Sequence, residues 1–132
     1  MSRDPMAMER ANHLSNEAIG AAIEVHRCLG PGLLESAYEA RLCRELEDRG
    51  VPFERQVPLP VMYKGRAIDA AYQIDVKVDG LLILELKAVE KIEPIHQAQL
   101  MTYLRLSDLW LALLMNFNVT VLKNGIKRIV NG

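Results

Sequence analysis

Residues 81–89 read LLILELKAV, and this stretch decides the fold that we expect for the chain. It is an almost continuous apolar run, which is typical of a strand buried on both faces in the middle of a sheet. Only Glu85 and Lys87 interrupt the run. Because the side chains of a strand alternate between its two faces, these charges point to one face and the leucines at 82, 84 and 86 point to the other.

Two interpretations of these charges are open. Burying a charge costs free energy unless the charge is paired or bound to a metal. Glu85 and Lys87 therefore either form an ion pair on a half-exposed face or belong to a larger polar site. The preceding strand favours the site, because Asp75 lies in AAYQIDVKV, residues 70–78, just across the turn from Glu85.

The loop between these two strands decides whether Asp75 joins the site. A two-residue loop of Asp79 and Gly80 would pair residue 75 with 84 and place Asp75 and Glu85 on opposite faces. A three-residue loop over 78–80, with Gly80 in a left-handed bulge, would pair residue 75 with 83. Asp75, Glu85 and Lys87 would then share one face. Since a slip of one residue flips every side chain, the site hypothesis predicts the three-residue loop.

Two carboxylates and a lysine on one face suit the hydrolysis of phosphodiester bonds. Carboxylate oxygens are hard ligands of the kind that Mg²⁺ and Mn²⁺ prefer, and these ions usually keep several waters. A bound ion would polarise the phosphate and lower the pKa of a bound water. Lys87 would orient or help deprotonate that water and stabilise the charge of the transition state. Without metal, Asp75 and Glu85 should repel each other.

Caps and apolar spacing predict three helices. The first is expected over residues 16–29, with Ser15 as its N-cap. The second is expected over 34–49 and ends at Gly50, which suits the left-handed position after a helix. The third is expected over 94–106, because proline is favoured in the first turn of a helix.

Turn residues divide the other strands. Besides 81–89, we expect an edge or irregular strand at 53–63, a strand at 67–78 after a Lys64-Gly65 turn, a buried strand at 109–115, and a C-terminal hairpin of 119–122 and 126–130 joined by Lys123-Asn124-Gly125. Strands that alternate with helices in this way predict an α/β fold.

Length and composition fit a single globular domain. The chain has 132 residues, half of them hydrophobic and a quarter charged. Its 17 acidic and 16 basic residues nearly balance, which weighs mildly against tight non-specific binding of nucleic acid but leaves room for a local basic groove. Residues 1–12 are expected to be a flexible lead-in and 13–132 the domain. The N-terminus lacks the apolar core of a signal peptide, so a cytoplasmic location is expected.

Two motifs resemble those of known nucleases. Asp75 followed by Glu85-Leu86-Lys87 and a helix resembles the D…(D/E)-x-K core of the PD-(D/E)XK superfamily, with Ile74 in place of the usual proline. In the next helix, Gln99-x-x-x-Tyr103 resembles the Q-x-x-x-Y motif of the helicase-associated exonuclease branch, where these residues lie beside the active site. The alternative for Gln99 and Tyr103 is that they only pack their helix on the sheet.

A third motif is more specific. GPGLLESAY, residues 30–38, is similar to the signature of the bacterial GxxExxY protein family, through Gly32, Glu35 and Tyr38. This resemblance extends over nearly the whole chain from about residue 13. It implies a restriction-endonuclease-like αβββαβ core with a central mixed sheet flanked by helices. Tyr38 is expected either to support the site or to lie in the core with its hydroxyl satisfied by a neighbour.

The resemblance also implies a set of site residues. Asp75 and Glu85 would bind Mg²⁺ or Mn²⁺, the backbone carbonyl of Leu86 would add a ligand, and Lys87 would activate water. Glu35 would complete the metal site, directly or through water. Taken without its motif, Glu35 would be an ordinary solvated helix residue.

Two functions therefore remain open. The first is a metal-dependent nuclease that hydrolyses phosphodiester bonds, with DNA as the expected substrate. The alternative is a catalytically silent module that retains the nuclease fold and binds nucleic acid or a protein partner. A homodimer is a further expectation, since one small domain offers little surface for a duplex. The region 53–63 and the C-terminal hairpin are the expected contact regions.

Overall fold

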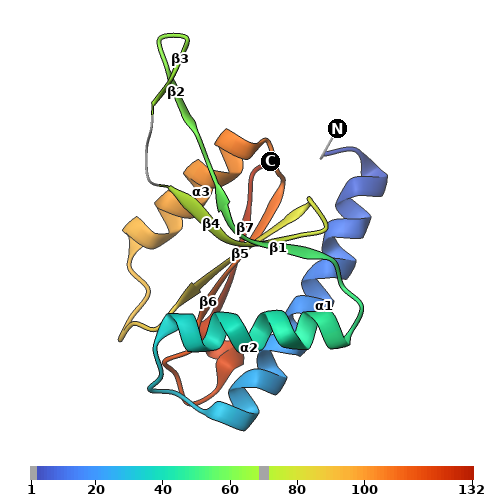
Figure 1. Ribbon diagram of the computed structural model, residues 1–132, viewed down its shortest axis with the longest axis vertical. Helices are drawn as coiled ribbons and strands as arrows, with labels where there is room; N and C mark the ends of the chain where they lie inside the picture. Colours follow the sequence, from blue (N-terminus) through green and yellow to red (C-terminus); the bar gives the residue numbers. More distant parts are fainter. Residues whose placement is uncertain (1–2, 69–71) are drawn as a thin grey trace.

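The structure is a computed structural model that describes residues 3–68 and 72–132, and it has the expected α/β architecture (Figure 1). Its elements in chain order are α1 (Pro5–Leu29), α2 (Glu35–Asp48), β1 (Phe53–Pro58), β2 (Val61–Tyr63), β3 (Arg66–Ile68), β4 (Gln73–Val78), β5 (Leu82–Lys87), α3 (Pro94–Ser107), β6 (Leu111–Asn116), the short 3₁₀ helix η1 (Leu122–Gly125) and β7 (Ile126–Val130).

Five strands form one mixed sheet in the order β1-β4-β5-β6-β7. Strands β5 and β6 are parallel, and the other neighbours are antiparallel. β5 is thus the middle strand, as its apolar sequence predicts. Read along the chain, α2, β1, β4, β5, α3 and β6 make up the expected αβββαβ core. The α1 helix precedes this core, β7 extends the sheet, and the β2–β3 hairpin is inserted between β1 and β4.

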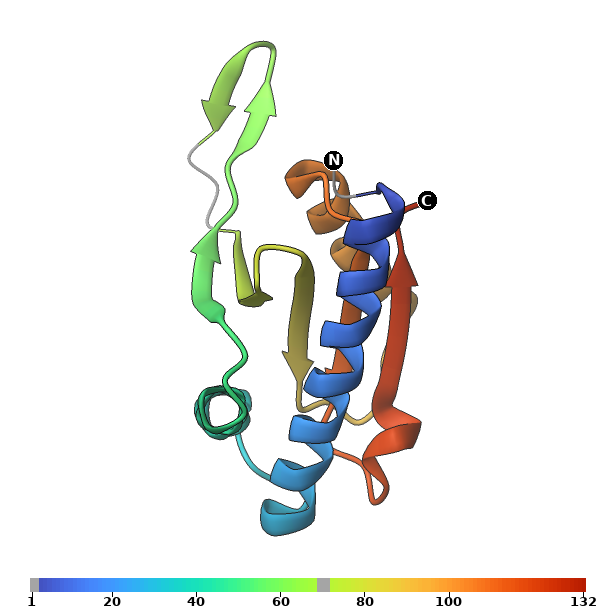
Figure 2. The same ribbon diagram turned by 90° about the vertical axis from the view of Figure 1, so that its right-hand side faces the viewer.

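Helices cover both faces of the sheet (Figure 2). On the face covered by α1 and α2, Leu82, Leu84 and Leu86 of β5 are buried among apolar side chains of the two helices. On the opposite face, Ile83 packs with Leu100 and other residues of α3. The alternation within β5 therefore gives each side of the sheet its own core. Because α3 connects two parallel neighbours, it is a crossover helix.

The start of α1 differs from the prediction. The predicted start at residue 16, with Ser15 as N-cap, is wrong, because the helix begins at Pro5. Asp4 is the N-cap, and its carboxylate accepts a hydrogen bond of 2.8 Å from the N–H of Ala7. The buried stripe continues upstream to Ala11, so residues 5–12 are turns of α1 rather than a separate lead-in. Although α1 has 25 residues, no described helix is both long and apolar enough to cross a membrane.

The region after α2 is more divided than expected. Gly50 follows the helix with a left-handed φ of 68°, as predicted, and β1 is an edge strand, as predicted. The predicted strand over 67–78 is wrong, because β3 pairs only with β2 in a separate two-stranded sheet while β4 joins the main sheet. Part of that prediction, residues 69–71, lies outside the described residues. The β2–β3 hairpin projects from the body of the molecule (Figures 1 and 2).

The predicted C-terminal hairpin is also wrong. Residues 122–125 form η1 instead of a two-strand turn, and β7 pairs with β6. Gly125 explains this path, because a Cβ at this position would collide with the backbone carbonyl oxygen of Asn116. The Asn-Gly pair therefore marks a close approach between two backbones rather than a hairpin turn.

This close approach predicts a large effect of one methyl group. Gly125→Ala should lower the free energy of unfolding by about 2 kcal/mol, because the Asn116 carbonyl belongs to the backbone and cannot move aside cheaply. Urea denaturation followed by circular dichroism would measure the change. Gly132→Ala is the control, since its Cβ would meet only ordinary van der Waals contacts. Equal stability of the two variants would contradict the interpretation.

Candidate active site

The β4–β5 hairpin brings the predicted charged residues together. Its strands pair Val78 with Leu82 and Val76 with Leu84, so the next row places Asp75 opposite Glu85. The predicted pairing of residue 75 with 83 is wrong by two residues. The loop does have three residues, but they are 79–81 rather than 78–80.

The shift of two residues keeps Asp75 beside Glu85. Asp79 and Gly80 both have positive φ, 48° and 67°, which gives the tight turn that starts the loop. Glu85 and Lys87 lie on the face of β5 that α3 covers, since Ile83 on the same side of the strand packs with that helix.

In β4 the alternation breaks at Asp75, because Ile74 packs in the core beside α3 whereas Val76 packs in the core beside α1 and α2. Alternation therefore does not assign Asp75 to the α3 face, and its hydrogen bond with the Leu86 N–H is what places it beside β5.

Beyond the last paired row of β4 and β5, carboxylate side chains accept hydrogen bonds from the backbone of the opposite strand. The regular pairing stops at Val76 and Leu84. Beyond it, the Asp75 carboxylate accepts a hydrogen bond of 2.9 Å from the N–H of Leu86, and a Glu85 carboxylate oxygen lies 3.4 Å from the backbone nitrogen of Asp75. The two carboxylates are thus held next to each other by backbone groups of the opposite strand.

Glu85 is in an unusual electrostatic environment. Glu85 is only 7% exposed. Within the part of the chain that the structure describes, neither Glu85 nor Asp75 forms an ion pair. Burial, together with repulsion from the Asp75 carboxylate, raises the pKa of Glu85 to about 8. The positive charge of Lys87 acts in the opposite direction and is the smaller effect. A cation placed between the two carboxylates would relieve this repulsion.

Lys87 lies at the end of β5 beside Asn116. The ion pair between Glu85 and Lys87, which was one interpretation of the sequence, does not form among the described residues. The backbone position is fixed instead, because the Phe117 N–H donates to the Lys87 carbonyl at 2.9 Å. The Asn116 side chain holds the next part of the chain through two hydrogen bonds to the backbone of Val89, 2.9 and 3.1 Å long.

The backbone carbonyl of Leu86 points toward the same site. In a strand, the N–H and C=O of one residue point to the same side. Because the Leu86 N–H donates to Asp75, the Leu86 carbonyl also points toward β4. The orientation agrees with the ligand role that the sequence resemblance implies for this carbonyl.

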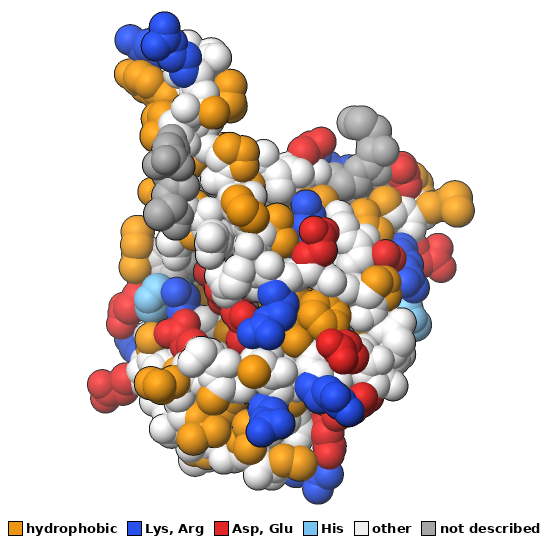
Figure 3. All heavy atoms as spheres, in the orientation of Figure 1, with side chains coloured by type: hydrophobic (Ala, Val, Ile, Leu, Met, Phe, Trp, Pro, Cys, Tyr) orange, Lys and Arg blue, Asp and Glu red, His pale blue; other side chains and the backbone are white. Residues whose placement is uncertain are grey.

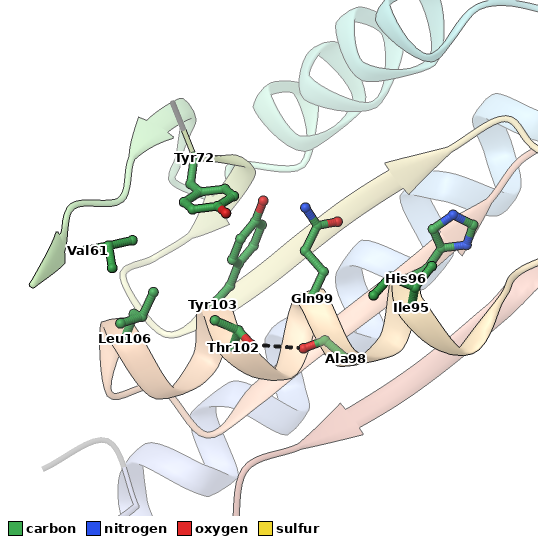
Figure 4. Close-up of a pocket in the computed structure, with 9 residues that line it drawn as sticks. All are labelled: Val61, Tyr72, Ile95, His96, Ala98, Gln99, Thr102, Tyr103 and Leu106. Atoms are coloured by element: carbon green, nitrogen blue, oxygen red, sulfur yellow. Dashed lines mark hydrogen bonds between the residues drawn. The ribbon is translucent and has the colours of Figure 1, made fainter. Parts of the chain in front are cut away.

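The α3 helix contributes the other two predicted residues. Gln99 and Tyr103 lie one turn apart and project from the same side of α3 (Figure 4). Tyr103 is buried. Burial and the negative charges of Glu85 and Asp75 raise the pKa of Tyr103 to about 12, which places its hydroxyl in the field of the carboxylates. Gln99 and Tyr103 also line a cavity of about 490 Å³ between α3 and the base of the β2–β3 hairpin.

The residues of the 30–38 motif serve different purposes. Tyr38 is fully buried, and its hydroxyl donates to the Gly30 carbonyl at 2.6 Å and accepts from the Leu33 N–H at 3.1 Å. Its ring stacks on Phe117 with centroids 4.5 Å apart. Tyr38 therefore holds the loop that begins α2. Glu35 is exposed in the first turn of that helix, and no described hydrogen bond or ion pair joins it to Asp75 or Glu85.

A second acidic residue of α2, which the sequence reasoning missed, does connect to the site. Glu39 is 8% exposed and accepts hydrogen bonds from Arg55 at 3.0 and 3.1 Å and from the Gln56 amide at 2.7 Å. The same Gln56 amide lies 3.5 Å from a carboxylate oxygen of Asp75. Glu39 thus orients the side chain that adjoins Asp75.

The sequence does contain a signal for Glu39. The buried face of α2 includes Tyr38, Leu42, Cys43 and Leu46, and Glu39 lies four residues before Cys43 on that face. A charge inside an apolar stripe predicts a buried partner. The partner, Arg55, could not be inferred from spacing, because it comes from an edge strand that only tertiary packing brings near α2.

The oxygen atoms of this site are ligands that suit a hard divalent ion, but they are too few to surround it completely. Within the described residues, no group of three or more His, Cys, Asp and Glu side chains is arranged to hold a metal ion. Two adjacent carboxylates with one backbone carbonyl match the way Mg²⁺ binds, since this ion takes one or two carboxylates and keeps several waters. Asp75, Glu85 and Leu86 are therefore the residues that would hold it.

The comparisons with known proteins agree with this geometry. A family model described as the PD-(D/E)XK nuclease superfamily matches residues 12–129. This range includes every residue of the β4–β5 site and of α3. The searches of curated proteins and of solved structures returned no match.

The raised pKa of Glu85 predicts how stability depends on pH without metal. Because the folded protein binds this proton more tightly than the unfolded chain, the stabilisation is fully present below about pH 4.5 and is lost as the pH rises through about 8. In EDTA, the free energy of unfolding should therefore fall by a few kcal/mol across this window. Glu85→Gln should remove most of this fall, as measured by urea denaturation at several pH values.

A matched control is Glu54→Gln, an exposed carboxyl on the edge strand β1. This variant should keep the pH dependence of the wild type. If Glu85→Gln and the wild type lose the same stability between pH 5 and 9, Glu85 does not carry the raised pKa.

Proposed function

The chain belongs to the PD-(D/E)XK nuclease superfamily, and from this premise we propose that it hydrolyses phosphodiester bonds in DNA with Mg²⁺ or Mn²⁺ as cofactor. One observation carries the proposal. Asp75 and Glu85 lie side by side across β4 and β5, with Lys87 on the same face of β5 as Glu85. The site is otherwise unfavourable, because the buried Glu85 carboxylate beside the half-buried Asp75 carboxylate destabilises the fold unless a cation or proton offsets the repulsion.

Each residue has a distinct role in the proposal. Asp75, Glu85 and the Leu86 carbonyl bind the metal. The bound ion neutralises charge on the phosphate and lowers the pKa of a water molecule. Lys87 lies on the same face without an ion-pair partner among the described residues, so its ammonium group is available to the attacking water and to a phosphate oxygen. Retention of this unpaired lysine beside two carboxylates favours catalysis over a silent module.

The α3 residues support the reaction. Tyr103 keeps its proton throughout the neutral range, because its pKa is raised to about 12. Its hydroxyl can therefore donate a hydrogen bond to a negatively charged oxygen near the carboxylates. Gln99, one turn earlier, presents an amide on the same side of the helix (Figure 4). In the proposal, both residues contact the strand that is cut.

The two acidic residues of α2 divide their roles. The carboxylate of Glu39 is already engaged by Arg55 and Gln56, so Glu39 is a positioning residue for Asp75. Glu35 is exposed and has no described ion pair, so its carboxylate is available. We therefore assign to Glu35 the completion of the metal site through a water molecule, as the motif implies, while Tyr38 holds the loop that presents it.

DNA rather than RNA and a homodimeric state are further parts of the proposal. The family implies a nucleic acid as substrate. Strand β1 is an edge of the sheet and leaves one side of its backbone open, which is where a second copy of the chain would pair.

The catalytic proposal predicts metal-dependent cleavage. Purified protein should cut DNA with Mg²⁺ or Mn²⁺ and not with EDTA. Asp75→Asn and Lys87→Ala should each lower the rate by roughly 100-fold or more, because each removes a group that acts on the reacting phosphate. Gel assays with labelled single-stranded, double-stranded and branched DNA would measure this. Circular dichroism would show that the variants are folded.

Two control variants lie on the same sheet. Lys77→Ala and Glu54→Gln change a lysine on β4 and a facing acid on β1, and both should cut at the wild-type rate. In parallel, Mn²⁺ should raise the melting temperature of the wild type but not of Asp75→Asn. A wild type that neither cuts DNA nor gains stability from Mn²⁺ would disprove the catalytic proposal and leave a binding module on a nuclease fold.

The division between Glu35 and Glu39 gives a second test. Glu39→Gln should lower the free energy of unfolding by about 1 kcal/mol, because Glu39 is buried while its partner Arg55 is 46% exposed and partly screened by water. Glu35→Gln should leave stability unchanged, since Glu35 is exposed, and should lower cleavage at limiting Mg²⁺ about tenfold. Excess Mg²⁺ should restore much of that activity. Full activity of Glu35→Gln at limiting Mg²⁺ would exclude Glu35 from the site.

A further inference from the structure

The β2–β3 hairpin exposes side chains that proteins usually bury. It extends beyond the sheet and the helices (Figures 1 and 2). Met62 and Tyr63 are each 60% exposed, and Ile68 is exposed as well. Three large apolar side chains on one short projecting hairpin indicate a binding surface, because they remain exposed to water in the free protein.

An apolar cavity opens at the base of this hairpin. Its volume is about 490 Å³, within the range of roughly 300–1,000 Å³ that is usual for small-molecule sites. Two tyrosines from different elements face it (Figure 4). Tyr72, just before β4, and Tyr103 of α3 have ring centroids 6.1 Å apart and an interplanar angle of 59°. Val61, Ile95 and Leu106 complete an apolar wall around the rings.

The cavity adjoins the face of β5 that carries Glu85. Tyr103 lines the cavity and packs in the same apolar cluster as Ile83, which lies two residues before Glu85 on that face. Gln99, one turn before Tyr103 on α3, lines the cavity as well (Figure 4). A strand bound in the cavity can therefore extend toward the carboxylates.

The elements beside the cavity are basic, although the chain as a whole carries 17 acidic and 16 basic residues. The described residues that line the cavity include no lysine, arginine or carboxylate. The β2–β3 hairpin, residues 61–68, adds Lys64 and Arg66, and α3 adds Arg105, and neither element contains an acidic residue. Lys64 and Arg66 are exposed near the tip of the hairpin, where basic side chains gather in Figure 3, and neither has an acidic partner among the described residues.

These observations specify the chemistry of the ligand. Unpaired cations beside exposed apolar and aromatic groups fit a phosphate backbone that carries accessible base rings. In a duplex, both faces of each base are stacked and its ring cannot enter an apolar cavity between two tyrosines. An unpaired strand meets no such barrier, because its bases can turn outward and stack on aromatic side chains.

We propose that the β2–β3 hairpin and α3 form a binding groove for single-stranded nucleic acid. One unpaired base stacks on the exposed ring of Tyr72, which packs against Tyr103, and the phosphates beyond it contact Lys64 and Arg66. The neighbouring phosphodiester then lies at the carboxylates of β4 and β5. This inference rests on the proposed function only for that last step, and binding itself requires no cleavage.

The test measures binding in the absence of cleavage. Fluorescence anisotropy would be recorded with the full-length protein and a labelled oligodeoxythymidine, and with a blunt duplex of mixed sequence beside its separated strand. Buffers would contain EDTA or, separately, Ca²⁺, an ion that also takes oxygen ligands. The variants are Tyr72→Leu, which removes the ring but keeps apolar bulk, and the double substitution Lys64→Glu with Arg66→Glu. The control is Lys123→Glu with Lys127→Glu, an equal change of charge on η1 and β7.

The groove predicts a specific set of results. The single strands should bind at least tenfold more tightly than the duplex, and Tyr72→Leu should weaken their binding about tenfold, since stacking is worth roughly 1–3 kcal/mol per base. The hairpin double variant should bind more weakly and show a shallower salt dependence, with the slope reduced by about 1.4 for two lost phosphate contacts. The control should bind like the wild type.

Several outcomes would overturn the inference. Equal affinity for duplex and single strand would do so, as would no binding in either buffer or wild-type binding by Tyr72→Leu and by the hairpin variant. Sedimentation velocity of the same proteins tests whether the hairpin instead mediates self-association. If the hairpin variant turns a dimer into a monomer while its DNA binding is unchanged, the hairpin is a self-association surface. Cleavage assays are separate, so a wild type that binds single strands but neither cuts DNA nor gains stability from Mn²⁺ would refute the nuclease proposal alone.

Discussion

Two carboxylates, one of them buried, lie side by side at the end of the β4–β5 ladder, and the rest of the site is arranged around their repulsion. Backbone N–H groups and the turn at Asp79 and Gly80 hold Asp75 and Glu85 in place. Repulsion between the two ionised carboxylates therefore lowers the stability of the folded protein. Such strain is typical of functional sites, where a ligand or a metal offsets it.

The architecture around the carboxylates makes this arrangement stable. β5 is the central strand, and its leucines and isoleucine anchor it to the cores on both faces of the sheet. The α3 helix closes one side, and Asn116 fixes the loop that leads from β5 to α3. Residues of the 30–38 motif have a mainly structural part, since Tyr38 fastens the loop before α2. The link from α2 to Asp75 runs through Glu39 and Gln56 instead.

The fold was largely predictable because its strongest local signals agree with the tertiary structure. An apolar run predicted β5, a proline in the first turn predicted α3, and the period of two placed Glu85 and Lys87 on one face of β5. The errors fell where local signals competed. Asp4 and Ser15 are both good N-caps, and the chain uses Asp4 because the buried stripe extends upstream. Lys123-Asn124-Gly125 is a strong hairpin signal, but pairing of β7 with β6 and the contact between Gly125 and Asn116 override it.

The sequence by itself determined which residues carry the charge and which face of β5 they share, because alternation along a strand needs no knowledge of partners. Only the tertiary structure decided which residue of β5 lies opposite Asp75. A three-residue loop at 78–80 and one at 79–81 have the same length, but the first pairs Asp75 with residue 83 and the second with Glu85. The tertiary structure also decided that Glu39 is linked to Asp75 through Gln56, and that Tyr72 and Tyr103 border one cavity. These contacts join residues far apart in the chain, and packing of α2 and α3 on the sheet is what brings them together.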